Sequence, residues 1–189
     1  MTTTQTSLTD LAQGYLDVLT DAGDPEPGHS GPRGWTVTSG VTDIVGPFVT
    51  VLPNGPDSLA YFHGLGAEPA ARLLEVLTDV QLADRQDDAP TLGTLLRAAV
   101  AHPGVIEAHG YLVGPARTDE RITAEGIYVY DRPELVVSPD HQPGCQCAEL
   151  WEYIQLDLGV DDARWMPDEI RPRVNAWRPQ EQCWSLWWK

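Results

Sequence analysis

Four stretches of the chain place apolar residues at every third or fourth position, the spacing of a helix that is buried on one side. These stretches are residues 8–20, 68–83, 91–101 and 148–158. Ser7 and Asp10 resemble a capping box at the start of the first stretch, and Gly159 follows the last one as a typical C-terminal cap. The pattern therefore predicts helices over these ranges.

Much of the remaining chain consists of short runs rich in β-branched and aromatic residues, which predict the strands of a sheet. These runs are residues 35–38, 41–45, 48–52, 59–63, 105–113, 122–131, 134–137 and 183–188. Asn54-Gly55 is a strong turn signal, so the runs on either side of it are expected to form a hairpin.

The order of these elements predicts a mixed α+β fold with a mostly antiparallel sheet and three to four helices, because turns join most of the strands. Beyond residue 158 we expect an irregular, tryptophan-rich tail until the final strand. Residues 21–34 contain four glycines and three prolines, a composition typical of a linker. The chain therefore divides into an N-terminal helix with a Pro/Gly-rich linker over 1–34 and a single α+β domain over 35–189.

The chain is strongly acidic, with 28 Asp and Glu against 12 Lys and Arg among its 189 residues and a formal net charge of -16. This charge opposes binding to a nucleic-acid backbone or to an anionic membrane, since both need clustered basic residues. A basic protein partner is electrostatically favoured instead. Eleven of the basic residues are arginine and the other is Lys189, a bias that indicates a high-GC bacterium or phage.

The compartment is predicted from what the sequence lacks. No apolar run approaches the length of a membrane-spanning helix, and residues 1–7 have neither the basic nor the apolar region of a secretory signal. Three cysteines are an odd number, unlike the paired framework of a small secreted protein. We therefore expect a cytoplasmic protein with reduced thiols.

The most specific chemical signal is a cluster of thiols and an imidazole in the last quarter of the chain. His141, Cys145 and Cys147 surround a Pro-Gly turn, and Cys183 lies in the final strand. Zinc favours four sulfur and nitrogen ligands, so these residues are candidate ligands of a structural zinc that would hold the tail in place. The Cys-x-Cys spacing is shorter than usual for zinc, and buried thiols or a redox pair are the alternatives.

Glu107, His109 and Tyr111 alternate along one predicted strand and therefore project from the same face of the sheet. A carboxylate, an imidazole and a phenol together are suited to general acid-base catalysis. If this strand pairs symmetrically with the next one, Tyr128 lies opposite Glu107. Gly126 then lies opposite His109 and leaves room above the imidazole. The alternative is an ordinary solvated sheet face with polar residues pointing outward.

Six of the seven tryptophans fall after residue 150. In the final strand, alternation places Trp184 and Trp188 on one face and Trp187 on the other. These three are candidate binding residues for a partner or for self-association, because tryptophan is enriched at interaction hot spots. Alternatively, the strand is buried on both faces.

The function that these observations favour is non-enzymatic. We expect an acidic binding protein of the regulator, immunity or inhibitor type, of the kind that a phage or mobile element carries, that recognises a protein partner. The alternative is a small hydrolase or transferase that uses Glu107, His109 and Tyr111, or a metal near His141. A pocket around His109 would favour the alternative, since a protein-binding module needs none there.

Overall fold

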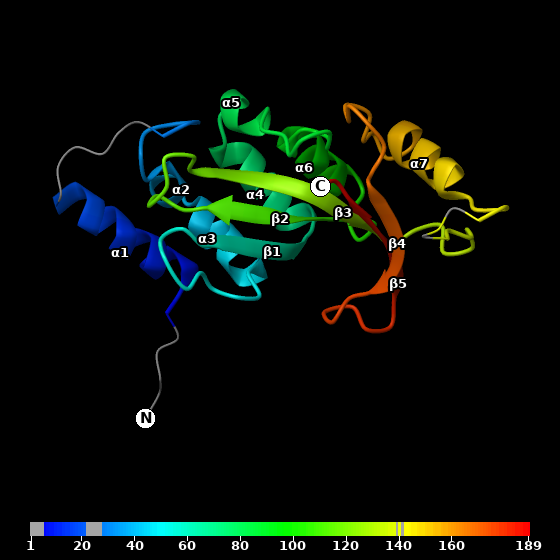
Figure 1. The fold of residues 1–189 in the computed structure, drawn as a ribbon, viewed down its shortest axis with the longest axis horizontal. Helices are drawn as coiled ribbons and strands as arrows, with labels where there is room; N and C mark the ends of the chain where they lie inside the picture. The colour runs from blue at the N-terminus through cyan, green and yellow to red at the C-terminus, as the bar shows by residue number, and fades with distance from the viewer. Residues whose placement is uncertain (1–5, 22–27, 139, 141) are drawn as a thin grey trace.

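The computed structural model describes residues 6–21, 28–138, 140 and 142–189, and its strands form one antiparallel sheet in the order β1-β2-β3-β5-β4 (Figure 1). The strands are β1 (Leu59–Leu65), β2 (Ile106–Val113), β3 (Arg121–Val129), β4 (Glu169–Val174) and β5 (Gln182–Trp187). The described α-helices are α1 (Leu8–Asp21), α2 (Trp35–Thr38), α3 (Val41–Val45), α4 (Ala67–Val76), α5 (Asp79–Leu82), α6 (Leu92–Ala101) and α7 (Cys147–Leu156). The predicted α+β fold with a mostly antiparallel sheet is confirmed, with more helices than expected.

The helices leave one broad face of the sheet uncovered. In Figure 1, α4 and α6 lie behind the sheet, and α6 contacts both β2 and β3. Alternate strand residues such as Ile106, Ala108 and Ile127 are buried in one apolar core with these helices. The residues between them therefore project from the opposite face, which we call the open face.

The pairing of β2 with β3 has the predicted register. Glu107 lies opposite Tyr128, and His109 lies opposite Gly126. The register shifts immediately after His109, where Glu125 is an extra residue in β3. A bulge of this kind bends a strand and re-aims the neighbouring side chains, and it lies at the centre of the open face.

The prediction of strands over 35–38, 41–45 and 48–52 is wrong. The first two runs form α2 and α3, and the third follows the short 3₁₀ helix η1 (Gly46–Phe48) as a segment with a single bridge from Val49 to Phe62. The predicted hairpin is therefore reduced to that bridge. Gly34 and Gly40 precede α2 and α3 with φ of 84° and 81°, a left-handed conformation that turns the chain into each helix.

A buried carboxylate also fixes the start of α2. Glu120, in the loop that leads into β3, is fully buried. Its carboxylate accepts hydrogen bonds from the backbone N–H of Gly34 at 2.7 Å and of Thr36 at 3.0 Å, and from the Thr36 hydroxyl at 2.6 Å. The first N–H groups of a helix lack partners within the helix, so this distant carboxylate takes the place of a local cap.

The helix predicted over 68–83 is divided into α4 and α5. Its apolar spacing is continuous, but Leu77 is extended and Thr78 caps α5. The Thr78 side chain accepts from the Gln81 backbone, and the Gln81 side chain accepts from Thr78 N–H. This capping box stabilises a new helix start and interrupts the longer helix.

The tail is more regular than predicted. β4 precedes β5 and forms the edge of the sheet, with Pro172 opposite Trp184. The proline concealed this strand in the sequence, although proline is tolerated in edge strands. Residues 134–137, predicted as a strand, form a turn and an extended segment whose backbone at Val136 bonds to Gln146.

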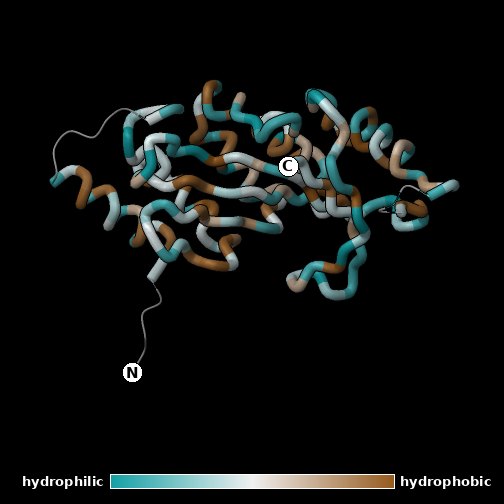
Figure 2. Tube along the Cα trace, in the orientation of Figure 1, coloured by the Kyte–Doolittle hydropathy of each residue, from teal (hydrophilic) through white to brown (hydrophobic). Residues whose placement is uncertain are grey.

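The N-terminal helix rests on the rest of the fold. Leu8 and Ala12 are buried, and α1 contacts α2 and α3. Figure 2 shows apolar and hydrophilic segments alternating along α1, as one-sided burial requires. Within the described ranges, no helix has both the length and the apolar character needed to cross a membrane.

Candidate functional site

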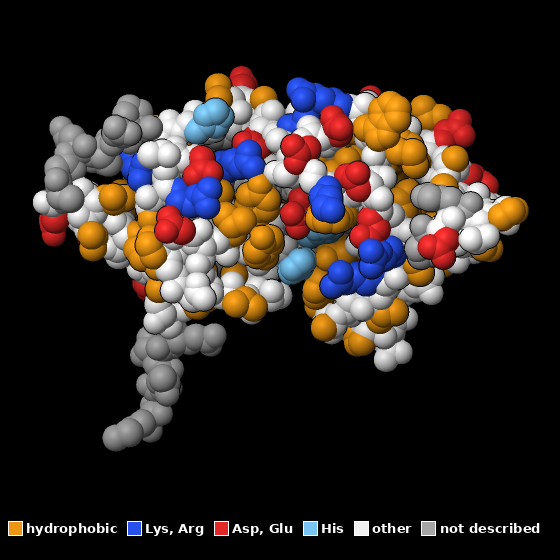
Figure 3. Space-filling view, viewed as in Figure 1, with side chains coloured by type: hydrophobic (Ala, Val, Ile, Leu, Met, Phe, Trp, Pro, Cys, Tyr) orange, Lys and Arg blue, Asp and Glu red, His pale blue; other side chains and the backbone are white. Residues whose placement is uncertain are grey.

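The open face of the sheet contains a pocket of about 510 Å³. Its lining includes His63 of β1, His109 of β2, Glu125 and Tyr128 of β3, Ser185 and Trp187 of β5, and Glu169, Arg171 and Arg173 of β4. Figure 3 shows this face, with histidine side chains at a hollow and basic and acidic side chains around it. The predicted sheet face is therefore hollowed at His109, and all five strands contribute to it.

His109 lies at the base of the pocket and is 4% exposed. Its ring stacks on Tyr128, with the ring centroids 4.6 Å apart, and occupies the space that a side chain at position 126 would fill. A Cβ on Gly126 would come within 2.4 Å of His109 Nε2. The glycine opposite His109 therefore allows the imidazole to lie flat and buried.

The two ring nitrogens of His109 have different environments. Nε2 lies 3.3 Å from the carbonyl oxygen of Leu186, which can only accept, so Nε2 carries the hydrogen of this bond. Nδ1 is buried and has no hydrogen-bond partner within the described part of the chain. The nearest acidic group is Glu125, whose Oε1 lies 3.9 Å from Nδ1. A buried polar atom without a partner is rare in native proteins and calls for an explanation.

His63 and Tyr128 form a hydrogen-bonded pair on one side of the pocket, with His63 Nδ1 3.0 Å from the Tyr128 hydroxyl. Burial lowers the pKa of His63, and the nearby His109 and Arg173 lower it further. Burial raises the pKa of Tyr128 to about 12. A neutral imidazole thus lies beside a protonated phenol at pH 7, an arrangement that can accept or pass on a proton.

Charged groups surround the remaining sides. Arg171 pairs with its neighbour Glu169. Arg173 lies 5.4 Å from the centre of the Tyr128 ring and, among the residues that the structure describes, forms no ion pair. Glu125 stands at the bulge beside His109. The pocket therefore contains basic as well as acidic side chains, whereas acidic residues predominate in the chain as a whole.

The loop between β4 and β5 packs against His63 from outside the pocket lining. Trp177 of this loop stacks on His63, with ring centroids 6.3 Å apart, and lies against Gly64. Gly64 has φ of 73°, and a Cβ there would come within 2.8 Å of the indole. Glycine is therefore required at this position both for the backbone conformation and for the close contact.

Glu107 holds this loop in place. Its carboxylate accepts a hydrogen bond from Trp177 Nε1 at 2.8 Å and from the Tyr130 hydroxyl at 3.1 Å, and it pairs with Arg178 at 3.3 Å. Arg178 also lies 3.5 Å above the Tyr130 ring. Glu107 thus holds the loop against His63, and neither Glu107 nor Trp177 lines the open-face pocket.

The structure does not bring the three predicted acid-base residues together. Tyr111 donates a hydrogen bond to Gln86 at 2.6 Å and contacts Arg121, which also pairs with Asp84 at 3.8 Å. His109 is grouped with His63, Tyr128 and Glu125 instead. Alternation along β2 placed the three side chains on one face, but each one bonds to groups from other elements.

Among the proposed zinc ligands, Cys145 and Cys147 interact with each other, whereas Cys183 has different neighbours. The Cys145 thiol contacts the backbone of Ser138, whereas the Cys183 thiol accepts from Asn175 Nδ2 at 3.4 Å. Burial raises the pKa of Cys183 to about 11, and burial together with Cys145 raises that of Cys147. In the described ranges, no three His, Cys, Asp or Glu residues are grouped as metal ligands. His141 lies outside those ranges, so zinc stays a prediction.

The tryptophans of β5 alternate as predicted. Trp184 and Trp188 are 3% and 1% exposed and pack in the core, whereas Trp187 lines the pocket. Trp188 donates a hydrogen bond to the carbonyl of Trp165, and the Trp165 side chain is 70% exposed. Recognition of a partner by the β5 tryptophans stays a prediction, with Trp187 the one that borders a cavity.

Several residues of the pocket escaped prediction from the sequence. His63 belongs to a strand whose partner is distant in sequence, and Arg173 belongs to β4, a strand that Pro172 concealed. Ser185 and Glu125 have no distinctive motif. The available signal was weak: His63 alternates with Tyr61 in a run predicted as a strand. Only the cross-strand register brings these residues to one site.

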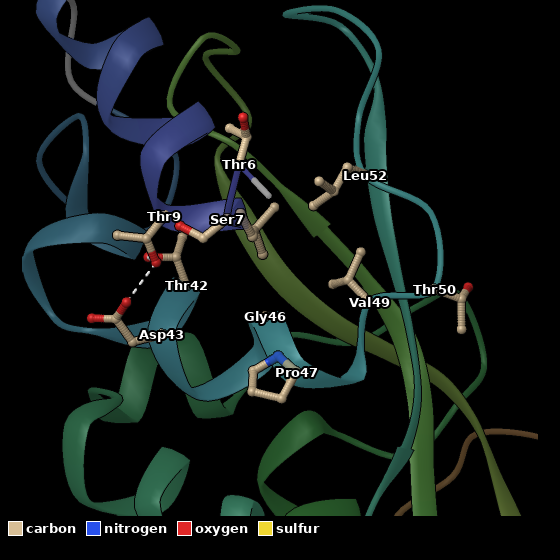
Figure 4. Close-up of a pocket in the computed structure, with 11 residues that line it drawn as sticks. Thr6, Ser7, Thr9, Thr42, Asp43, Gly46, Pro47, Val49, Thr50 and Leu52 are labelled. Atoms are coloured by element: carbon tan, nitrogen blue, oxygen red, sulfur yellow. Dashed lines mark hydrogen bonds between the residues drawn. The ribbon is translucent and has the colours of Figure 1, made fainter. Parts of the chain in front are cut away.

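A second pocket, of about 580 Å³, lies between the start of α1 and the segment after α3 (Figure 4). Figure 4 shows its hydroxyl side chains, and the dashed line marks the hydrogen bond from Thr9 to Asp43 at 2.6 Å. Asp43 is its only ionisable lining residue among those described, and this bond already engages it. The pocket on the open face therefore has the richer chemistry.

No family model, curated protein or solved structure matches this chain. Any inference about function therefore depends on the chemistry of the open-face pocket.

Proposed function

We propose that the protein binds a small charged molecule in the open-face pocket. The observation that carries the proposal is His109: a buried imidazole with an unpartnered Nδ1 lines a pocket of about 510 Å³. This volume lies in the range of small-molecule sites, which combine apolar walls with a few convergent polar groups. Tyr128 and Trp187 supply aromatic surface, while Arg173 and Ser185 supply hydrogen-bond donors.

The proposal is tested by filling the pocket. Ser185 lines it, so Ser185→Trp should occupy the ligand volume. A library of charged fragments is screened by thermal shift against the unaltered protein, and each stabilising compound is retested on Ser185→Trp. The matched control is Val18→Trp on α1, an exposed position outside this pocket.

The expected result is a set of compounds that stabilise the unaltered protein and the Val18→Trp variant but not Ser185→Trp, because a ligand stabilises only the state that binds it. If every stabilising compound still acts on Ser185→Trp, or if none stabilises the unaltered protein, the pocket is not a small-molecule site.

A second candidate function, catalysis by proton transfer, is favoured by the hydrogen bond between His63 and Tyr128. A neutral imidazole at the pocket is a competent general base. His63→Asn should then abolish turnover of a bound compound while leaving its affinity within about threefold. Unchanged turnover would assign His63 to binding alone.

A further inference from the structure

The acidic and basic side chains of the pocket are arranged at different positions along its strands. The cross-strand register places Trp187 opposite Glu169, and Ser185, two residues along β5, opposite Arg171. Because each strand residue advances about 3.3 Å, these two rows lie about 7 Å apart. Glu125 belongs at the first row, next to Gly126, which pairs with Trp187.

The first row presents two hydrogen-bond acceptors to one space. Because Nε2 donates to the Leu186 carbonyl, the neutral form of the His109 ring has no hydrogen on Nδ1, and this nitrogen can accept; it lies 3.9 Å from the Glu125 carboxylate. One ammonium nitrogen can donate to both atoms at ordinary hydrogen-bond distance, whereas an anion would be repelled by Glu125. This end of the pocket therefore fits a cationic group.

The second row presents donors. Tyr128 pairs with Ser185 across β3 and β5. Arg173 lies one row further along β4, opposite Cys183, and its guanidinium reaches back to 5.4 Å from the Tyr128 ring centre. Arg173 forms no ion pair with any residue that the structure describes, so its donors are available to a ligand. A guanidinium beside a hydroxyl recognises a carboxylate with directed hydrogen bonds.

We infer that the ligand is a zwitterion, with an ammonium group bound by Glu125 and His109 and a carboxylate bound by Arg173 and Ser185. The row spacing sets the two charges about 7 Å apart, which suits an ω-amino acid or a short peptide better than a simple α-amino acid. This inference rests on the proposed function, because it names the class of molecule that occupies the same pocket.

Three matched probes test the inference by isothermal titration: 6-aminohexanoate, hexanoate and hexylamine. They share a six-carbon chain and differ only in which charged ends they carry. The zwitterion should bind at least about tenfold more tightly than either single-charge probe, since each end adds a charge-assisted hydrogen bond. Equal affinity for hexanoate and 6-aminohexanoate would reduce the site to an anion site and overturn the inference. Equal affinity for hexylamine and 6-aminohexanoate would reduce the site to a cation site and would also overturn the inference.

Two variants assign the two ends. Glu125→Gln should remove the advantage of 6-aminohexanoate over hexanoate without weakening hexanoate, and Arg173→Gln should remove its advantage over hexylamine. The matched controls are Glu68→Gln and Arg72→Gln on α4, an exposed pair outside the pocket, which should leave all three affinities unchanged. If Glu125→Gln leaves the advantage intact, the assignment of the ammonium end is wrong.

The inference and the proposed function fail in different ways. If none of the three probes binds while other fragments show dependence on Ser185, the ligand is not a zwitterion of this class but the pocket still binds small molecules. If neither the probes nor the fragments bind, both are wrong.

Discussion

Glu120 and His109 are both buried ionisable residues of the β2–β3 hairpin, and they differ in whether other residues satisfy their hydrogen-bonding atoms. Each carboxylate oxygen of Glu120 accepts hydrogen bonds from the start of α2, and no cavity adjoins it among the described pockets. His109 donates one bond to Leu186 and leaves Nδ1 unpartnered at a pocket.

The difference is between a buried group that stabilises the fold and a buried group whose remaining hydrogen bond is left for a ligand. A buried polar group whose partners all come from the same chain stabilises the fold, and removing it leaves those partners unsatisfied. A buried polar group that lacks a partner is costly unless a ligand or water completes it. The predictions below test this distinction.

The largest effect is expected for Glu120→Ala. The substitution leaves two buried N–H groups and the Thr36 hydroxyl without their acceptor, so the free energy of unfolding should fall by about 3–5 kcal/mol. Urea denaturation measures the change. Glu134→Ala, at an exposed ion pair, is the control and should leave the free energy of unfolding essentially unchanged. If Glu120→Ala lowers the free energy of unfolding as little as the control does, the Glu120 carboxylate does not stabilise the fold.

Gly126→Ala should have the next largest effect. The added methyl would lie 2.1 Å from the Leu186 carbonyl oxygen and 2.4 Å from His109 Nε2, which forces the strand or the imidazole to move. We expect a loss of about 2 kcal/mol and a changed NMR signal for His109. Gly14→Ala is the control, because nothing lies near its Cβ and alanine favours a helix. An unshifted His109 signal would contradict the tight packing over Gly126.

The register of β2 and β3 was predictable as far as the pair of His109 and Gly126, beyond which the extra residue Glu125 shifts it by one, whereas the start of the domain was not predictable. Alternation and a single loop determine the register of adjacent strands, so Gly126 could be placed opposite His109 from the sequence. The β-branched residues of 35–45 favour strands locally, but the carboxylate of Glu120 stabilises a helix there, and no local pattern reveals so distant a cap.

The pocket was predictable only in part for the same reason. His109 was a candidate because β2 is regular, but the other residues that line its pocket come from β1, β3, β4 and β5. The strand β4 contains Pro172, which weakens the sequence signal, and the loop that follows it returns to β2 through Glu107. Contacts between segments so far apart require the three-dimensional fold.

Glu107→Gln should have an intermediate effect on stability, because Glu107 holds the loop between β4 and β5 and does not line the pocket. The amide keeps an acceptor for Trp177 but loses the charge that Arg178 and the indole share, so stability should fall by about 1–2 kcal/mol. The indole of Trp177 should become more exposed, so acrylamide should quench its fluorescence more strongly. A Trp177→Phe variant gives the signal of the other tryptophans for comparison. Unchanged quenching would mean that the loop is held without Glu107.

The smallest effect concerns His63. Its pKa lies below the usual 6.5 in the folded protein, so the unfolded chain binds more protons near pH 6 and stability falls as the pH decreases from about 7 through the lowered pKa. His63→Asn should make stability less dependent on pH over this interval. Urea denaturation at several pH values, with His102→Asn as the control, measures the difference. A His63 NMR titration midpoint at or above 6.5 would contradict the prediction.

The outer edge of the sheet also has a consequence for the behaviour of the protein at high concentration. Exposed edge strands invite a second chain to extend the sheet, the usual route to fibres and aggregates. On β4 the consecutive residues Arg171, Pro172 and Arg173 are exposed, and together they set two positive charges and a missing N–H on that edge. Arg173, which is proposed to bind the ligand, therefore also opposes pairing of this edge with a second molecule, as does Arg171. Replacing both arginines should favour aggregation as well as weaken binding.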